Sequence, residues 1–169
     1  MEQILIPIER AKLLEKKMLA KAESRLHCKI GIHDENQVVI NGKPYDEYNA
    51  KNILQAFGRG FPFDTSCKLL SENYYFKYID LRDMFRNKEQ VRRIKARIIG
   101  EDGRAKAYME SISEADIAIY GDTISLIGTI EGIHIATVAI EILLGGGTHK
   151  TAYKAMEDAR RKAKEAGLL

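Results

Sequence analysis

The two halves of this chain of 169 residues repeat each other, and such a repeat restricts the possible folds more than any other feature of the sequence. At an offset of 87 residues, Glu23-Ser24 aligns with Glu110-Ser111, and Ile30-x-Ile32 aligns with Ile117-x-Ile119. One residue dropped near Asn36 changes the offset to 86, and three more pairs then match: Gly42 with Gly128, Ala50 with Ala136, and Gly60 with Gly146. We therefore expect two copies of one small unit, covering residues 1–70 and 71–169.

Apolar periodicity predicts the same order of elements in both halves: strand, helix, helix, strand, strand, helix. The expected strands lie near residues 4–8, 28–32, 38–40, 74–81, 115–120 and 123–127. The expected helices lie near residues 9–26, 45–57, 90–99, 104–113 and 130–144, and a last helix, capped by Thr148, runs to about residue 166. This order predicts an α+β fold in which each copy packs a small three-stranded sheet against three helices.

The copies differ at Gly100-Glu101-Asp102-Gly103, which joins two expected helices of the second half. Its glycines allow a sharp turn, and free N–H groups at the start of the next helix favour an anion. Carried back by 87 residues, the segment aligns with Leu13-Leu14-Glu15-Lys16, which contains no glycine. We therefore expect the first copy to have its two helices fused or joined by a tight turn, and to serve as a structural partner or a protein-binding surface.

The charge of the chain is unevenly distributed around this loop. Residues 86–106 hold eight basic and three acidic side chains, a net of +5, and residues 148–169 have a net of +3, whereas the whole chain has only +3. A basic region around a glycine loop in an otherwise acidic protein indicates a polyanionic partner. A solvated helix face is the alternative interpretation of a single basic run.

Four segments occur here in the order found in one family: Gly58-Arg59-Gly60-Phe61, Tyr78-Ile79-Asp80-Leu81, Arg97-Ile98-Ile99-Gly100 up to Arg104, and Tyr120-Gly121. The glycine loop between two helices resembles that of a KH domain, the RNA-binding module whose loop clamps a nucleotide backbone. Nearly the whole chain resembles the tandem-KH pre-ribosomal factors known as the partner of Nob-one and the dimethylase-interacting protein, and its size fits their archaeal form. The resemblance implies two tandem KH type I domains followed by a C-terminal helix.

Members of this family are not enzymes, and they bind small-subunit ribosomal RNA near its 3′ end during maturation. The resemblance therefore implies an RNA partner (small-subunit rRNA or its precursor), a ribosome-maturation nuclease or methylase, and a translation initiation factor subunit, with no cofactor and no membrane contact. The site residues that we expect to bind RNA are Arg59, Arg92, Arg93, Lys95, Arg97, Ile99, Gly100, Glu101, Asp102, Gly103, Arg104 and Lys106.

The two carboxylates of the loop depart from the usual basic or neutral residues of a working KH loop. Each costs about 1 kcal/mol beside a phosphate in water, so we expect RNA binding to be weakened but retained, because Arg97, Arg104 and their basic neighbours surround them. An alternative is that Gly100 and Gly103 only form a tight helix–helix turn capped by Asp102. The corresponding alternative function is a protein–protein adaptor with degenerate KH domains and little RNA affinity.

Several other side chains allow two interpretations each. Ile99, Ile117 and Ile119 either contact unstacked bases or belong to the core, and the core is favoured. Arg59 either reaches a phosphate or caps a helix end. The aromatic residues of the strand near residues 74–78 are either a stacking surface or core, and the basic cluster Arg160-Arg161-Lys162 with Lys164 is either a phosphate contact or a solvated face.

Signals for an enzyme are weak. The segment Gly145–Thr151 resembles a phosphate loop, but His149 occupies the position before Lys150 that such a loop gives to glycine. His27, Cys28 and His33 lack metal-ligand spacing, and His134 is expected in the core of an apolar helix. Two isolated cysteines and the lack of a basic apolar leader favour a reducing, cytoplasmic location.

Overall fold

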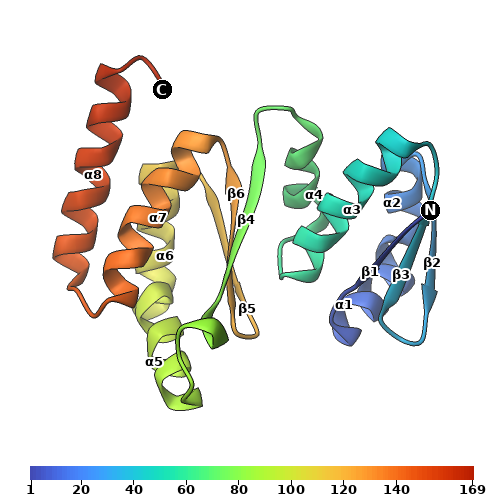
Figure 1. Cartoon of the computed structure of the whole chain (residues 1–169), viewed down its shortest axis with the longest axis horizontal. Helices are drawn as coiled ribbons and strands as arrows, with labels where there is room; N and C mark the ends of the chain where they lie inside the picture. The colour runs from blue at the N-terminus through green and yellow to red at the C-terminus, as the bar shows by residue number, and fades with distance from the viewer. The chain divides into compact units, whose positions relative to one another are not determined.

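The chain folds into two compact units, Met1–Glu72 and Asn73–Leu169, in the computed structural model, which describes residues 1–169 (Figure 1). Each unit contains one antiparallel sheet of three strands together with its own helices and its own apolar core. The α+β class expected from the sequence is therefore confirmed for both halves. None of the helices combines the length and the apolar character that a membrane span requires.

The sheet of the first unit has the strand order β1-β3-β2, so its central strand is the last of the three along the chain. Its elements are β1 (Glu2–Leu5), α1 (Ile8–Leu13), the π-helix η1 (Leu14–Met18), α2 (Leu19–Leu26), β2 (Lys29–His33), β3 (Gln37–Asn41), α3 (Pro44–Gly58), α4 (Phe63–Ser66) and the 3-10 helix η2 (Cys67–Leu70). The expectation of a first strand reaching Ile8 is wrong. Pro7 precedes the first helical residue and has no N–H for a sheet, so the strand ends at Leu5.

Where the second half has its glycine loop, the first unit runs on as one helix with a wide π turn. The turn covers Leu14–Met18 and keeps the residues of α1 and α2 in a continuous helical path until Met18, whose φ is −123°. Leu14 points into the core and is fully buried. Of the two expected alternatives, fused helices are therefore the one that the structure contains.

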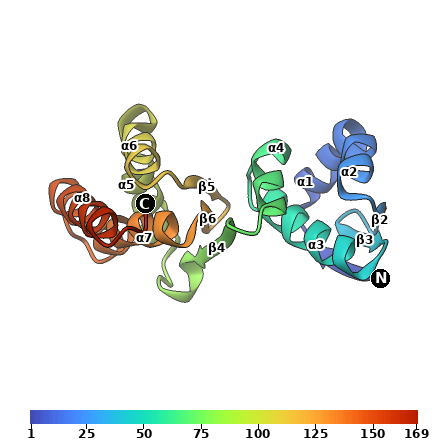
Figure 2. The same cartoon turned by 90° about the horizontal axis from the view of Figure 1, so that it is seen from above.

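The second unit repeats the arrangement with sheet order β4-β6-β5 and adds a long C-terminal helix. Its elements are β4 (Tyr75–Asp80), the 3-10 helix η3 (Leu81–Asp83), α5 (Lys88–Ile99), the 3-10 turn η4 (Glu101–Gly103), α6 (Arg104–Ser113), β5 (Asp116–Tyr120), β6 (Thr123–Gly128), α7 (Ile130–Leu144) and α8 (His149–Glu165). Helix α7 packs against the sheet, and α8 packs on α7 and α6 rather than on the sheet (Figure 2).

The two units share strand order, the spacing of their elements and a repeated side-chain hydrogen bond. Residues 29–33 and 116–120 form equivalent strands at the offset of 87, and residues 44–58 and 130–144 form equivalent helices at the offset of 86. In each unit a glutamate accepts a hydrogen bond from the amide of an isoleucine seven residues on: Glu23 from Ile30 at 3.0 Å, and Glu110 from Ile117 at 2.8 Å. The repeat proposed from the sequence is thus present in three dimensions.

Candidate nucleic-acid interface

The loop between α5 and α6 has a backbone that requires glycine at its first position. Gly100 has φ 74° and ψ 175°, and a Cβ placed on it would lie 2.5 Å from the Cβ of Ala105. Gly103 has φ 73° but open space around it, and Asp102 also adopts a left-handed conformation, with φ 52°. The loop is therefore a tight, exposed turn whose backbone passes directly onto the first turn of α6.

The side chains of this turn are unpartnered. Glu101, Asp102 and Arg104 are exposed, and none of them makes a hydrogen bond or ion pair within the protein. The interpretation of Asp102 as a helix cap is wrong, because the N-cap residue of α6 is Gly103 and no side chain caps it. Two free carboxylates and one free guanidinium thus lie where N–H groups at the start of α6 lack helical acceptors.

Most basic residues of α5 and α6 that we expected at the site have partners within the protein. Arg92 and Arg93 both approach Glu89, at 2.9 and 3.7 Å, and hydrogen bonding from Arg92 holds the pKa of Glu89 below its usual range. Lys95 donates to the carbonyl oxygen of Gly121 at 2.8 Å. Lys106 lies 3.2 Å from Glu110, whereas Arg104 has no partner within the protein.

Arg97, expected at the RNA surface, instead ties α5 to the end of α7. Its Nη1 donates to the carbonyl oxygen of Leu143 at 3.1 Å, and its Nη2 donates to that of Gly147. A signal in the repeat identifies this role: Arg10 occupies the equivalent position and donates to the equivalent carbonyls of Phe57 and Phe61, at 2.9 and 2.6 Å. Because only the second copy has the glycine loop and both copies have this arginine, the structural role of the arginine does not require the loop.

The apolar candidates divide between surface and core. The core interpretation holds for Ile117, which is 3% exposed, and is wrong for Ile99, which is 37% exposed directly before the loop. Ile119 is half-buried. Tyr75 and Tyr78 are about half exposed, and the rings of Phe76 and Tyr78 lie 5.9 Å apart. Arg59 is half-buried directly after α3 and belongs to the first unit, whereas the loop belongs to the second.

Helix α8 is held beside α6 by contacts from three of its residues, Tyr153, Glu157 and Arg160. The rings of Tyr108 and Tyr153 lie 4.4 Å apart, and the hydroxyl of Tyr108 donates to Glu157, which raises the pKa of Tyr108. Arg160 donates to the carbonyl oxygen of Ile112 and approaches Glu114 at 3.1 Å. Of the C-terminal basic cluster considered in the sequence, Arg160 is therefore structural.

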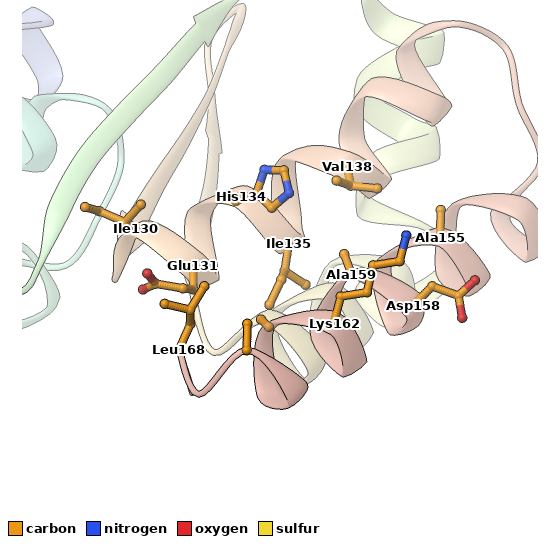
Figure 3. Close-up of a pocket in the computed structure, with 12 residues that line it drawn as sticks. Ile130, Glu131, His134, Ile135, Val138, Ala155, Asp158, Ala159, Lys162 and Leu168 are labelled. Carbon is orange, nitrogen blue, oxygen red and sulfur yellow. The ribbon is translucent and has the colours of Figure 1, made fainter.

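A separate cavity of about 720 Å³ lies between α7 and the C-terminal half of α8 (Figure 3). Its lining is mostly apolar, with Ile130, Ile135 and Leu168 among its walls, and Glu131 and Lys162 among its charged residues. The expectation of a buried His134 is wrong, because His134 is exposed and lines this cavity.

No group of three or more His, Cys, Asp or Glu side chains is placed to hold a metal ion. Burial raises the pKa of both cysteine thiols, Cys28 and Cys67.

The second unit matches a known family of domains. Residues 75–161 match the model of a eukaryotic-type KH domain (KH domain type I), the second KH domain of PNO1. A KH domain-containing protein of Methanocaldococcus jannaschii is 36% identical over 85% of this chain, and the pre-rRNA-processing protein PNO1 of Chaetomium thermophilum is 25% identical over 82%. The chain spans 66% and 58% of the length of these two relatives.

Two solved structures from Pyrococcus horikoshii resemble almost the entire chain. Dim2p is 33% identical, with a TM-score of 0.83 over 93% of this chain and 98% of its own. A chain of the a/eIF2alpha-aDim2p-rRNA complex is 32% identical, with a TM-score of 0.86 over 95% of this chain and 94% of its own. The similarity therefore extends beyond the matched KH domain and includes the first unit.

Proposed function

Because this chain belongs to the family of KH-domain proteins that includes PNO1 and Dim2p, we propose that it is a non-catalytic RNA-binding protein of small-subunit ribosome biogenesis. The observation that carries the proposal is the Gly100–Gly103 turn, which presents its backbone, the free cation Arg104 and the exposed Ile99 together on the surface. A KH loop of this form clamps the backbone of about four nucleotides. The phosphates would lie over the turn, and a base would contact Ile99.

We assign the two units different tasks. The second, residues 71–169, is the KH domain that holds RNA, and the first, residues 1–70, is a KH-like domain without a glycine loop. The shared strand and helix offsets and the paired Glu23 and Glu110 hydrogen bonds support a KH-like first domain. Its π turn presents no backbone N–H groups to a phosphate, because helical hydrogen bonds use them. Its tasks would be structural support and contact with proteins.

The partners follow from what similar proteins are named for. The relative of Chaetomium thermophilum is a pre-rRNA-processing protein, and the Pyrococcus horikoshii complex contains rRNA and a/eIF2alpha. We extend both to this chain: its RNA would be small-subunit rRNA or its precursor, and its protein partners an initiation-factor subunit and a maturation nuclease or methylase. The cytoplasm is the location that goes with these partners.

The decisive experiment measures binding to a single strand that copies the 3′ end of archaeal small-subunit rRNA, by fluorescence anisotropy at two salt concentrations. Arg104→Ala should weaken binding about fivefold, as loss of one phosphate contact predicts, and should lower the salt dependence. Lys17→Ala is the matched control, because Lys17 occupies the equivalent position of the first unit, is exposed and has no partner. Equal effects of both variants, or none, would contradict the assignment of the loop.

The free carboxylates of Glu101 and Asp102 favour a second candidate, a protein–protein adaptor with little affinity for RNA. Both carboxylates would oppose a phosphate, and either would suit a basic protein surface. The same titration separates the two functions. If wild-type protein binds none of the specific strand, a scrambled strand and a duplex, the adaptor function is supported. Preference for the specific strand supports RNA binding.

A further inference from the structure

We propose that the RNA path does not end at the glycine loop but continues onto the first two turns of α8, where Lys150 and Lys154 contact successive phosphates. This inference rests on the proposed function and adds a second part to its site. Lys150 belongs to Gly145–Thr151, the segment that resembles a phosphate loop but lacks its glycine before the lysine. Neither lysine is among the residues expected to bind RNA from the sequence.

The position of Lys150 follows from how the start of α8 is anchored. The ring Nε2–H of His149 donates to the carbonyl oxygen of Arg97 at 2.7 Å, in the last turn of α5. Gly100 follows Arg97 by three residues, so the residue next to Lys150 touches the helical turn from which the glycine loop begins. Arg97 also donates to Gly147, which secures the residues before α8 to the same turn.

Helices α6 and α8 run in the same direction, so their first turns lie at the same end of the unit (Figure 1). Contacts along the pair give the register. Tyr108 of α6 packs on Tyr153 of α8, and further along both helices the carbonyl oxygen of Ile112 accepts a hydrogen bond from Arg160. Going back one turn from Tyr108 and Tyr153 reaches Arg104 on α6 and His149 and Lys150 on α8. Arg104 and Lys150 are therefore level with each other at the start of the two helices.

The lysines in the first two turns of α8 are available to bind an anion. Lys150 and Lys154 are exposed, and neither makes a hydrogen bond or an ion pair within the protein. The side of α8 that meets α5 and α6 is instead formed by His149, Tyr153 and Glu157, each a turn apart. Lys150 and Lys154 follow that face by one residue and stand one turn apart, about 6 Å along the helix. With Arg104 they make three unpaired cations in the first turns of α6 and α8, and a phosphodiester backbone is the partner that such a group suits.

The C-terminal half of α8 differs from this N-terminal half. Arg160 and Arg161 are engaged by Glu114 and Asp158, at 3.1 and 2.9 Å. Lys162 and Lys164 are exposed without a partner, but Lys164 lies 14 residues, or about 21 Å, beyond Lys150 along the helix. This second pair of lysines carries the same charge at a distance from the loop, and it serves as an internal control.

The test compares two RNAs that copy the 3′ end of small-subunit rRNA, one of about four nucleotides that fills the loop alone and one of about twelve. In the full-length protein, Lys150→Ala with Lys154→Ala should weaken binding of the longer strand at least tenfold and lower its salt slope by about 1.4, while the short strand binds as before. Lys162→Ala with Lys164→Ala should change neither. Circular dichroism should show that all variants keep the helical content of the wild type.

The outcomes separate the inference from the function on which it rests. If wild-type protein binds both strands and the Lys150/Lys154 variant does so equally well, the path ends at the loop and the inference is wrong. If the two lysine pairs have equal effects, α8 is only a diffuse basic surface, which also overturns it. If wild-type protein binds no RNA, the proposed function itself fails.

Discussion

The guanidinium of Arg97 donates to the carbonyl oxygen of Leu143 at 3.1 Å and joins helices α5 and α7 through two residues that are 46 positions apart in sequence. A second bond from Arg97 reaches Gly147, so one side chain binds a carbonyl in the last turn of α7 and another in the segment between α7 and α8. Carbonyls in the last turn of a helix have no partner within the helix. Arg97 therefore holds the α5 segment that leads into the glycine loop against the segment that leads into α8.

Arg97→Ala should lower the stability of the protein by about 2–4 kcal/mol, since hydrogen bonds from charged groups are worth more than neutral ones and two of them are lost. Urea denaturation followed by circular dichroism measures the change. Arg92→Ala is the control, because Arg92 pairs only with Glu89 on the surface and should change stability by less than about 0.5 kcal/mol. Equal stability of both variants would show that the Arg97 bonds contribute little.

The two loop glycines should differ in how they tolerate alanine. At Gly100 a methyl group would overlap with Ala105, and the conformation is one that only glycine adopts readily, so Gly100→Ala should cost about 2 kcal/mol or more. At Gly103 the space is open and only the left-handed backbone is unfavourable, at about 1 kcal/mol. Thermal unfolding of the two variants checks this order, and a less stable Gly103→Ala would contradict it.

Removal of the loop carboxylates should strengthen RNA binding. The double variant Glu101→Gln with Asp102→Asn removes two charges and keeps a residue that tolerates the left-handed backbone of Asp102. Each charge removed should raise affinity by up to about fivefold at low salt, as the Coulomb term predicts. Glu15→Gln is the control, because Glu15 is exposed at the position equivalent to Asp102 in the first unit. Unchanged affinity in anisotropy titrations would mean that the loop does not face phosphate.

The contact between Tyr108 and Glu157 should make the docking of α8 sensitive to alkaline pH. Hydrogen bonding to Glu157, then burial, raises the pKa of Tyr108 above its usual value of 10.0. A raised pKa means that the contribution to stability is complete below pH 10.0 and is lost as the pH rises through the higher folded pKa. Urea midpoints measured across this range should fall more steeply for wild type than for Tyr108→Phe. Parallel curves would show that Tyr108 does not couple to folding.

The sequence predicted the fold well because it carries the same pattern twice. Alternating and helical apolar positions placed most strands and helices within a few residues, and the offsets of 87 and 86 reproduce the bounds of β2, β5, α3 and α7. The pattern failed at β1, where Pro7 shortened the strand, and at His134, which lies on the exposed side of a helix whose other sides are apolar. Amphipathic periodicity shows that a helix has an apolar face but does not show how far its neighbours cover it.

The candidate site was harder to predict, because backbone acceptors leave no mark in a sequence. Nothing in the residues near Leu143 or Gly147 shows that their carbonyls bind Arg97, so this arginine looked like one more free cation. Similarly, Lys95 is partnered by a carbonyl of the turn at Gly121. The glycine loop itself was predictable, since positive φ angles at Gly100 and Gly103 require a residue type that can be read directly.

The π turn of the first unit has a consequence for how the two copies diverged. The offset between the copies is 87 residues on both sides of it, at Arg10 with Arg97 and at Glu23 with Glu110, so no insertion or deletion separates the copies there, and point substitutions alone account for the difference. The position that exposes Glu101 in the second copy holds Leu14, fully buried, in the first. Glycines introduced at Leu13 and Lys16, the equivalents of Gly100 and Gly103, would remove a side chain that packs on the core and would free the backbone beside the buried Leu14, so the first copy should lose stability if it is given the loop.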